Sequence, residues 1–166
     1  MATPEGAQLA EGIRRNVEEL KKICKGLNED ISNSAPLNRW SPKQIVSHLC
    51  GPEGSGFMPT VQAILDQDTP FLDIEAENPF FSGKRTTMTL AELLNELEVE
   101  YSRLAELVES LSMEQLSRKA HIPLLKETPL GEYPSLAGWI QALSEYHMGF
   151  HIDHLQEILQ EMGVKA

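Results

Sequence analysis

Three histidines lie close together near the end of the chain, in the stretch from Tyr146 to His154. His147, His151 and His154 stand at positions i, i+4 and i+7. At about 100° per residue, these positions fall on one face of a helix. Neutral imidazole is a common ligand of divalent metals, and an H-x-x-x-H pair on a helix lets two rings reach one ion. The spacing indicates a metal site, although histidines also fall at this spacing by chance.

The same helical face carries the apolar residues Ile140, Leu143 and Ile158. The histidines are therefore expected to point into the bundle and away from water. Burying a neutral imidazole costs free energy unless its ring nitrogens find partners. A metal on one nitrogen and a carbonyl or carboxylate on the other meets that requirement.

A further histidine, His48, follows a clearly signalled helix start. Ser41 can cap the helix, Pro42 suits its first position, and Gln44 completes an S-x-x-Q capping box. His48 then lies on the inward side of this helix, beside apolar neighbours. Taken alone, a histidine in such a position is more often an ordinary hydrogen-bonded core residue, but here it is the candidate third ligand.

Two segments together resemble the DinB-like superfamily, including its YfiT branch of proposed metal-dependent hydrolases. The first runs from Trp40 to Leu49 and reads W-S-x-x-x-I-x-x-H-L, and the second is the late H-x-x-x-H pair. The resemblance covers nearly the whole chain in helix order and spacing, but the segment from Gly51 to Gly56 has more glycines than is usual. It implies an all-α four-helix bundle with long crossover connections, in which one divalent ion is held by three ligands. Those ligands would be His48, His147 and His151.

Three more residues are candidates for supporting roles. His154 is close to His147 around the helix but about two turns further along it, so we expect it to support a ligand or line the pocket, with a role as fourth ligand as the alternative. Tyr146 flanks the motif and is a candidate pocket residue, unless it is simply a packed aromatic. Glu53, shortly after His48, is the nearest carboxylate for a general base, unless it is only a solvated glutamate.

Three neutral imidazoles leave a divalent ion with positive charge and open positions, as in catalytic sites. Such an ion lowers the pKa of bound water or of a bound thiol, and zinc, nickel, manganese and iron all accept imidazole. The residues do not choose between the two chemistries. The resemblance favours the thiol, because characterised relatives use low-molecular-weight thiols such as bacillithiol or mycothiol.

We therefore expect a metal-dependent S-transferase that joins a low-molecular-weight thiol to small electrophiles. The alternatives are a hydrolase using a metal-bound water, a metal-binding stress protein without turnover, and a plain bundle whose histidines are empty.

Composition restricts the partners. The chain has 166 residues, with 25 acidic against 14 basic ones and a formal charge of -11. Without a basic face, nucleic acid and anionic membranes are not expected as partners, and a small-molecule substrate is expected. No apolar run is long enough to span a bilayer and the first residues do not form a signal peptide, so the expected location is cytoplasmic. A homodimer is compatible with the resemblance, since relatives are often dimers.

The elements that must position these residues are four long helices within one domain, residues 1–166. Two cysteines, Cys24 and Cys50, are expected to be reduced packing residues. A short helix of one or two turns should follow Ser112. Long connections should separate the second helix from the third and the third from the last. The expected helices are 8–27, 42–65 with a kink or a break at 51–56, 90–111 and 136–162, with connections at 66–87 and 121–134.

Overall fold

The computed structural model describes residues 2–164 of the chain, and it confirms the predicted all-α four-helix bundle. The helical elements are α1 (Pro4–Cys24), α2 (Glu29–Ser32), α3 (Pro42–Cys50), α4 (Met58–Asp66), η1 (Gly83–Thr87), α5 (Leu90–Ser110), α6 (Met113–Ser117), η2 (Pro123–Leu125), α7 (Leu136–Gln141), η3 (Ala142–His147) and α8 (Met148–Glu161). Residues 2–164 contain no strand, only isolated bridges between loop residues.

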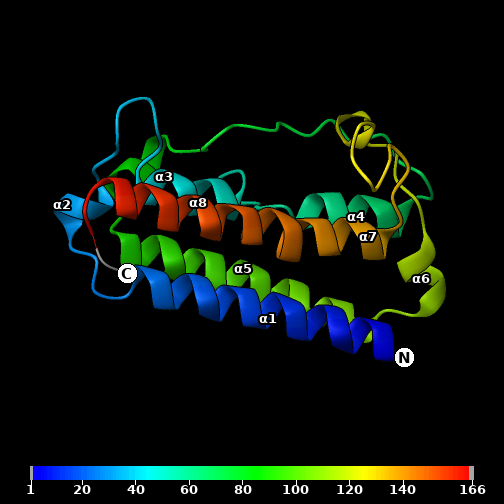
Figure 1. The fold of residues 1–166 in the computed structure, drawn as a ribbon. Helices are drawn as coiled ribbons and strands as arrows, with labels where there is room; N and C mark the ends of the chain where they lie inside the picture. Colours follow the sequence, from blue (N-terminus) through cyan, green and yellow to red (C-terminus); the bar gives the residue numbers. More distant parts are fainter. Residues whose placement is uncertain (1, 165–166) are drawn as a thin grey trace.

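The long helices lie side by side in two layers (Figure 1). The first layer pairs α1 with α5. The second contains α3 and α4, one after the other, beside the continuous rod of α7, η3 and α8. Aliphatic side chains from all four rods fill the space between the layers. Cys24 and Cys50 belong to this core and are free, as expected, and burial raises the pKa of the Cys24 thiol to about 12.

Most helix starts are where the side-chain caps predict them. The hydroxyl groups of Ser41, Thr89 and Ser112 each accept a hydrogen bond from the third backbone N–H of their helix, in complete capping boxes. The first helix begins earlier than expected, because the Thr3 hydroxyl accepts from Gly6 N–H and Pro4 occupies the first turn. Thr3 and Pro4 signal this helix start in the sequence, but they come before the apolar repeat from which the expected start was taken.

The glycine-rich stretch after α3 breaks the second helix completely. Gly51 ends α3 with a φ of 76°, a left-handed conformation that favours glycine. A turn then leads into α4, so the alternative of a kinked continuous helix is wrong.

The last helix differs from the regular α-helix that was predicted. Its start after Ser135 and the left-handed Gly163 beyond its end agree with the expectation. Its middle, however, is the wider π-helical turn η3, which ends at His147.

The two long connections touch each other outside the bundle. Residues 67–82 cross back over the second layer (Figure 1), and the start of this crossover meets the segment that follows α6. Backbone N–H groups of Thr69 and Leu72 donate to the carbonyls of Lys119 and His121, at 2.9 Å each. Within the described residues, no helix is long and apolar enough to cross a membrane.

Candidate metal centre

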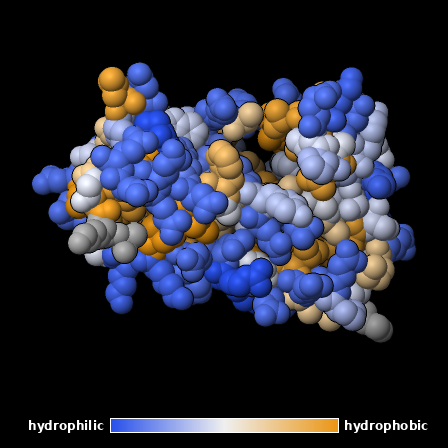
Figure 2. Space-filling model, viewed as in Figure 1, coloured by the Kyte–Doolittle hydropathy of each residue, from blue (hydrophilic) through white to orange (hydrophobic). Residues whose placement is uncertain are grey.

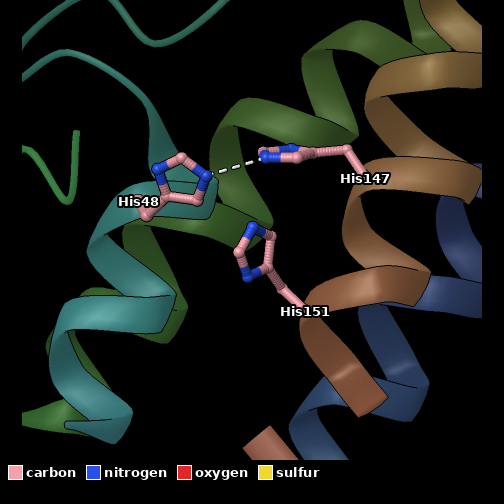
Figure 3. Close-up of side chains that lie close together, drawn as sticks. All are labelled: His48, His147 and His151. Carbon is pink, nitrogen blue, oxygen red and sulfur yellow. Dashed lines mark hydrogen bonds between the residues drawn. The ribbon is translucent and has the colours of Figure 1, made fainter. Parts of the chain in front are cut away.

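The structure brings His48, His147 and His151 together between α3 and the rod formed by η3 and α8 (Figure 3). One nitrogen from each ring lies within 4.8 Å of those from the other two. The Nε2 atoms of His48 and His147 are only 2.8 Å apart. His48 and His151 are buried, with 2% and 7% of their surface exposed.

His48 is held from both ends. The capped start of α3 fixes the helix on which His48 stands, and the left-handed Gly51 ends that helix three residues after His48. Its Nδ1 lies 2.6 Å from the backbone carbonyl of Asn78 in the crossover. Because a carbonyl can only accept, Nδ1 carries the proton, and the lone pair of Nε2 faces the other two histidines.

The π-helical turn places His147. Five-residue closures of this kind widen a helix locally and are frequent at functional sites. The carbonyl of Ser144, inside the wide turn, accepts a hydrogen bond of 2.7 Å from the Asn16 amide on α1. Asn16 therefore stabilises a turn that the sequence of η3 alone does not reveal.

His151 stands in the first turns of α8, with His154 behind it. The Nδ1 atoms of these two rings are 3.2 Å apart, so one donates to the other and Nε2 of His151 is left for the cluster. The Trp40 indole stacks on His151 with ring centres 6.1 Å apart and lies 5.0 Å from His48. Trp40 thus covers one side of the cluster with an apolar surface.

Burial keeps the three rings neutral. Loss of hydration, reinforced by the neighbouring His48, lowers the pKa of His147 to about 4. The same loss, reinforced by the other histidines, lowers the pKa of His151 to about 3. Burial also lowers the pKa of His48, against the opposing effect of the Asn78 carbonyl. All three lone pairs are therefore available at neutral pH.

These residues fit a divalent ion. Two imidazole ligands of one tetrahedral ion have nitrogens about 3.3 Å apart. Here the three nitrogens lie within 4.8 Å of one another, and the Nε2 atoms of His48 and His147 are 2.8 Å apart. Without an ion, His48 and His147 can share only one proton between their facing Nε2 atoms. The buried Nδ1 of His147 has no hydrogen-bond partner in the described structure. Three neutral imidazoles packed this closely are explained by a shared cation better than by packing alone.

Buried Arg85 fastens the crossover to the end of α3. Its guanidinium, 1% exposed, donates to the carbonyls of Ser47 at 3.2 Å, Phe80 at 3.4 Å and Gly51. Its Nε pairs with Glu96 of α5 at 3.0 Å. The Arg85 contacts therefore hold the segment whose Asn78 carbonyl orients His48.

A cavity of about 790 Å³ opens beside His48 and His147. Its walls come from the end of α3 and the turn after it, from the rod of α7, η3 and α8, and from both long connections. The face shown in Figure 2 is hollowed, with hydrophobic side chains around the opening. The apolar lining residues are Phe57, Ile74, Ala76, Leu124, Leu125, Pro129, Leu130, Trp139, Ala142, Leu143 and Phe150.

The other candidate residues lie at different distances from this centre. Tyr146 lines the cavity with a side chain that is 62% exposed. Glu53 is exposed in the turn after α3, lines no part of the cavity and is not grouped with the histidines. The break after α3 leaves Glu53 exposed to solvent, and its role as a general base stays a prediction.

Sequence reasoning missed Asn78, Arg85 and the cavity wall after Ile122. The Asn78-Pro79 dipeptide signals a turn, and the Asn78 side chain does accept from Phe80 N–H. The sequence around this turn does not indicate which of its carbonyls accepts the hydrogen bond from His48. The role of Trp40 could have been suspected, since it opens the motif that contains His48.

No protein-family model and no curated protein sequence matches the chain. Among solved structures, it is similar to YfiT from Bacillus subtilis, which is described as a probable metal-dependent hydrolase with an unusual four-helix bundle topology. The TM-score is 0.74 at 19% identity, over 99% of this chain and 92% of YfiT. The similarity extends over nearly the whole of both chains, and the chain therefore has the fold of YfiT, as the two sequence motifs implied.

Proposed function

We propose that this protein is a divalent-metal-dependent enzyme that transfers a low-molecular-weight thiol to small electrophiles. The observation that carries the proposal is a group of three neutral imidazoles, two buried and one half-buried, that opens onto an apolar cavity. Three protein ligands leave room at an ion for one more group, which distinguishes catalytic from closed structural sites.

In this proposal, His48, His147 and His151 hold the ion. A divalent ion bound there supplies a positive charge that lowers the pKa of a thiol or water beside it. The Asn78 carbonyl orients His48 and His154 supports His151. Trp40 limits the access of water to the cluster. The cavity receives the electrophile, whose carbon gains a bond to sulfur as its leaving group departs.

The absence of a suitable base favours thiol transfer over hydrolysis. Within the described residues, no carboxylate joins the histidine group, and Glu75 is the single carboxylate in the cavity wall. Glu75 is exposed and its Oε2 accepts from the Asn78 amide at 2.5 Å. Hydrolysis ordinarily uses a group that moves a proton to or from the reacting atoms, whereas a thiol that coordinates a cation loses its proton without one.

The experiment compares thiols on metal-loaded protein. Conjugation of a fluorogenic electrophile such as monochlorobimane is followed with bacillithiol, mycothiol, cysteine or no thiol, after subtraction of the uncatalysed rate. We expect catalysis with at least one thiol, lost in His147→Ala and retained in His121→Ala, since His121 lies outside the cluster. Turnover that is equal in both variants would contradict the proposal.

Metal-dependent hydrolysis is the second candidate, favoured by the fold shared with YfiT. The same variants are incubated with ester and amide substrates in thiol-free buffer. Cleavage that is abolished by His147→Ala, together with no thiol conjugation, would replace the transferase with a hydrolase.

A further inference from the structure

Among the residues that the structure describes, the wall of the cavity beside the histidines has no basic side chain, although the proposed thiol co-substrates carry ionised groups. No Lys or Arg is found among its described lining residues, and Glu75 is its single acidic side chain. Apart from an ion held by the histidines, an anionic ligand would therefore find no counter-charge in the wall and would meet a carboxylate. Burying an unpaired charge in such surroundings is costly.

Three polar side chains of the wall donate hydrogen bonds inside the protein, while Tyr146 and Glu75 are exposed. The Trp139 indole N–H donates to the Thr60 hydroxyl at 2.9 Å, so the ring offers the cavity its apolar surface. The Thr128 hydroxyl donates to the Leu125 carbonyl at 2.7 Å. The Gln141 amide donates to Glu145 at 3.2 Å. The hydrogen atoms donated in these three bonds are not available to a ligand.

Aromatic and aliphatic side chains form the part of the wall that lies next to His147. The Phe57 ring stands edge-on to His147, with ring centres 6.3 Å apart. Leu143 and Ala142 of the π-helical turn lie on the same rod as His147, and both line the cavity. A cavity of about 790 Å³ is in the range that takes a drug-sized molecule.

From these features we infer that the cavity selects an uncharged, largely apolar electrophile, with its reactive carbon toward His48 and His147. That the ligand is an electrophile rests on the proposed function. That it is uncharged and largely apolar rests on the residues of the wall alone. The charged part of the thiol stays outside the cavity, because no cation within the wall would hold it.

The test uses two probes with one skeleton in metal-free, thiol-free protein. N-phenylnaphthylamine is uncharged, and anilinonaphthalene sulfonate adds one anionic group; both fluoresce when they enter an apolar site. We expect one saturable site that binds the uncharged probe at least about tenfold more tightly, because the sulfonate must give up its hydration in the cavity. Equal or tighter binding of the sulfonated probe would overturn the inference.

Placing a cation in the wall should change this preference. Leu124 lines the cavity and is 46% exposed, so Leu124→Lys can keep its ammonium group hydrated at the rim. We expect the preference to shrink or reverse. The matched control is Leu37→Lys, at an apolar residue that is 90% exposed and does not line the cavity. Thr128→Lys, also at an exposed wall position, gives a second variant if Leu124→Lys fails to fold.

The outcomes separate this inference from the proposed function. Probe binding needs neither metal nor thiol, so a preference for the uncharged probe that shifts in Leu124→Lys, but not in Leu37→Lys, supports the inference even if no turnover is found. Thiol-dependent turnover together with no preference, or with equal shifts in both variants, would overturn the inference and leave the proposed function standing.

Discussion

Replacing Arg85 by Met should reduce stability much more than removing an arginine from the surface. The Arg85 side chain is 1% exposed and satisfies carbonyls of Ser47, Gly51 and Phe80 while pairing with Glu96. Methionine has similar length but no donors. The variant therefore leaves three backbone acceptors and one carboxylate without their common partner.

The expected magnitude follows from the exposure of Glu96. Breaking a buried ion pair by removing one partner costs about 3–5 kcal/mol. The Glu96 side chain is 28% exposed, so water can partly replace Arg85 as its partner. The expected loss of stability is therefore at the low end of this range, about 3 kcal/mol. For a chain of this size, that loss lowers the melting temperature by about 6–12 °C.

Circular dichroism during heating measures this loss, with Arg14→Met as the matched control. Arg14 pairs with Glu109 at 2.6 Å, but the two side chains are 50% and 43% exposed. An exposed pair contributes about 1 kcal/mol or less, so Arg14→Met should lower the melting temperature by no more than about 4 °C. Similar losses in the two variants would refute the reasoning from burial.

Arg85→Met should also weaken metal binding at a distance. Arg85 touches no histidine of the cluster but holds the crossover that presents the Asn78 carbonyl to His48. Loss of such support typically lowers metal affinity by about 10–100-fold. Competition with a chelator at a temperature where both proteins are folded measures the change. An unchanged affinity would mean that Asn78 keeps its position without Arg85.

Two further predictions concern acid and the Trp40 cover. In the metal-free protein, His147 and His151 have pKa values of about 4 and 3 when folded, against about 6.5 in the unfolded chain. The unfolded chain thus binds more protons between these values, so the stability contributed by their neutral forms is present above about pH 6.5 and lost as the pH falls toward 4. Urea unfolding along a pH series should show this slope, and a series in His147→Ala with an equal slope would contradict it. Trp40→Ala should release metal to a chelator faster than Trp40→Phe, because a phenyl ring still covers the cluster; equal release rates would show that Trp40 does not shield it.

Helix starts and the pair of histidines on the last helix could be predicted because their signals are local. Ser41 and Gln44 form a capping box within four residues of each other, and the positions of His147 and His151 follow from helical spacing. The pairing of His48 with them came from the two motifs taken together. Their proximity in the structure agrees with that expectation.

The remaining parts of the site depend on contacts between distant segments. The π-helical turn at His147 is supported by Asn16, which lies 128 residues from Ser144 in the chain. The orientation of His48 depends on the carbonyl of Asn78, and carbonyls are present at every residue. The cavity exists because two crossover loops pair outside the bundle, through hydrogen bonds such as that from Leu72 to His121. Periodicity within one helix carries no information about such contacts.

The most direct test of the metal centre is the metal content of the untagged protein by plasma mass spectrometry, before and after reconstitution with zinc, nickel, manganese or iron. The wild type is compared with His48→Ala, His147→Ala, His151→Ala and the control His121→Ala, whose ring pairs with Glu132 at 3.2 Å outside the cluster. The account predicts close to one divalent ion per chain in the wild type and the control, and a loss in each of the three cluster variants. No bound ion after reconstitution, or an ion kept by all the cluster variants, would contradict it.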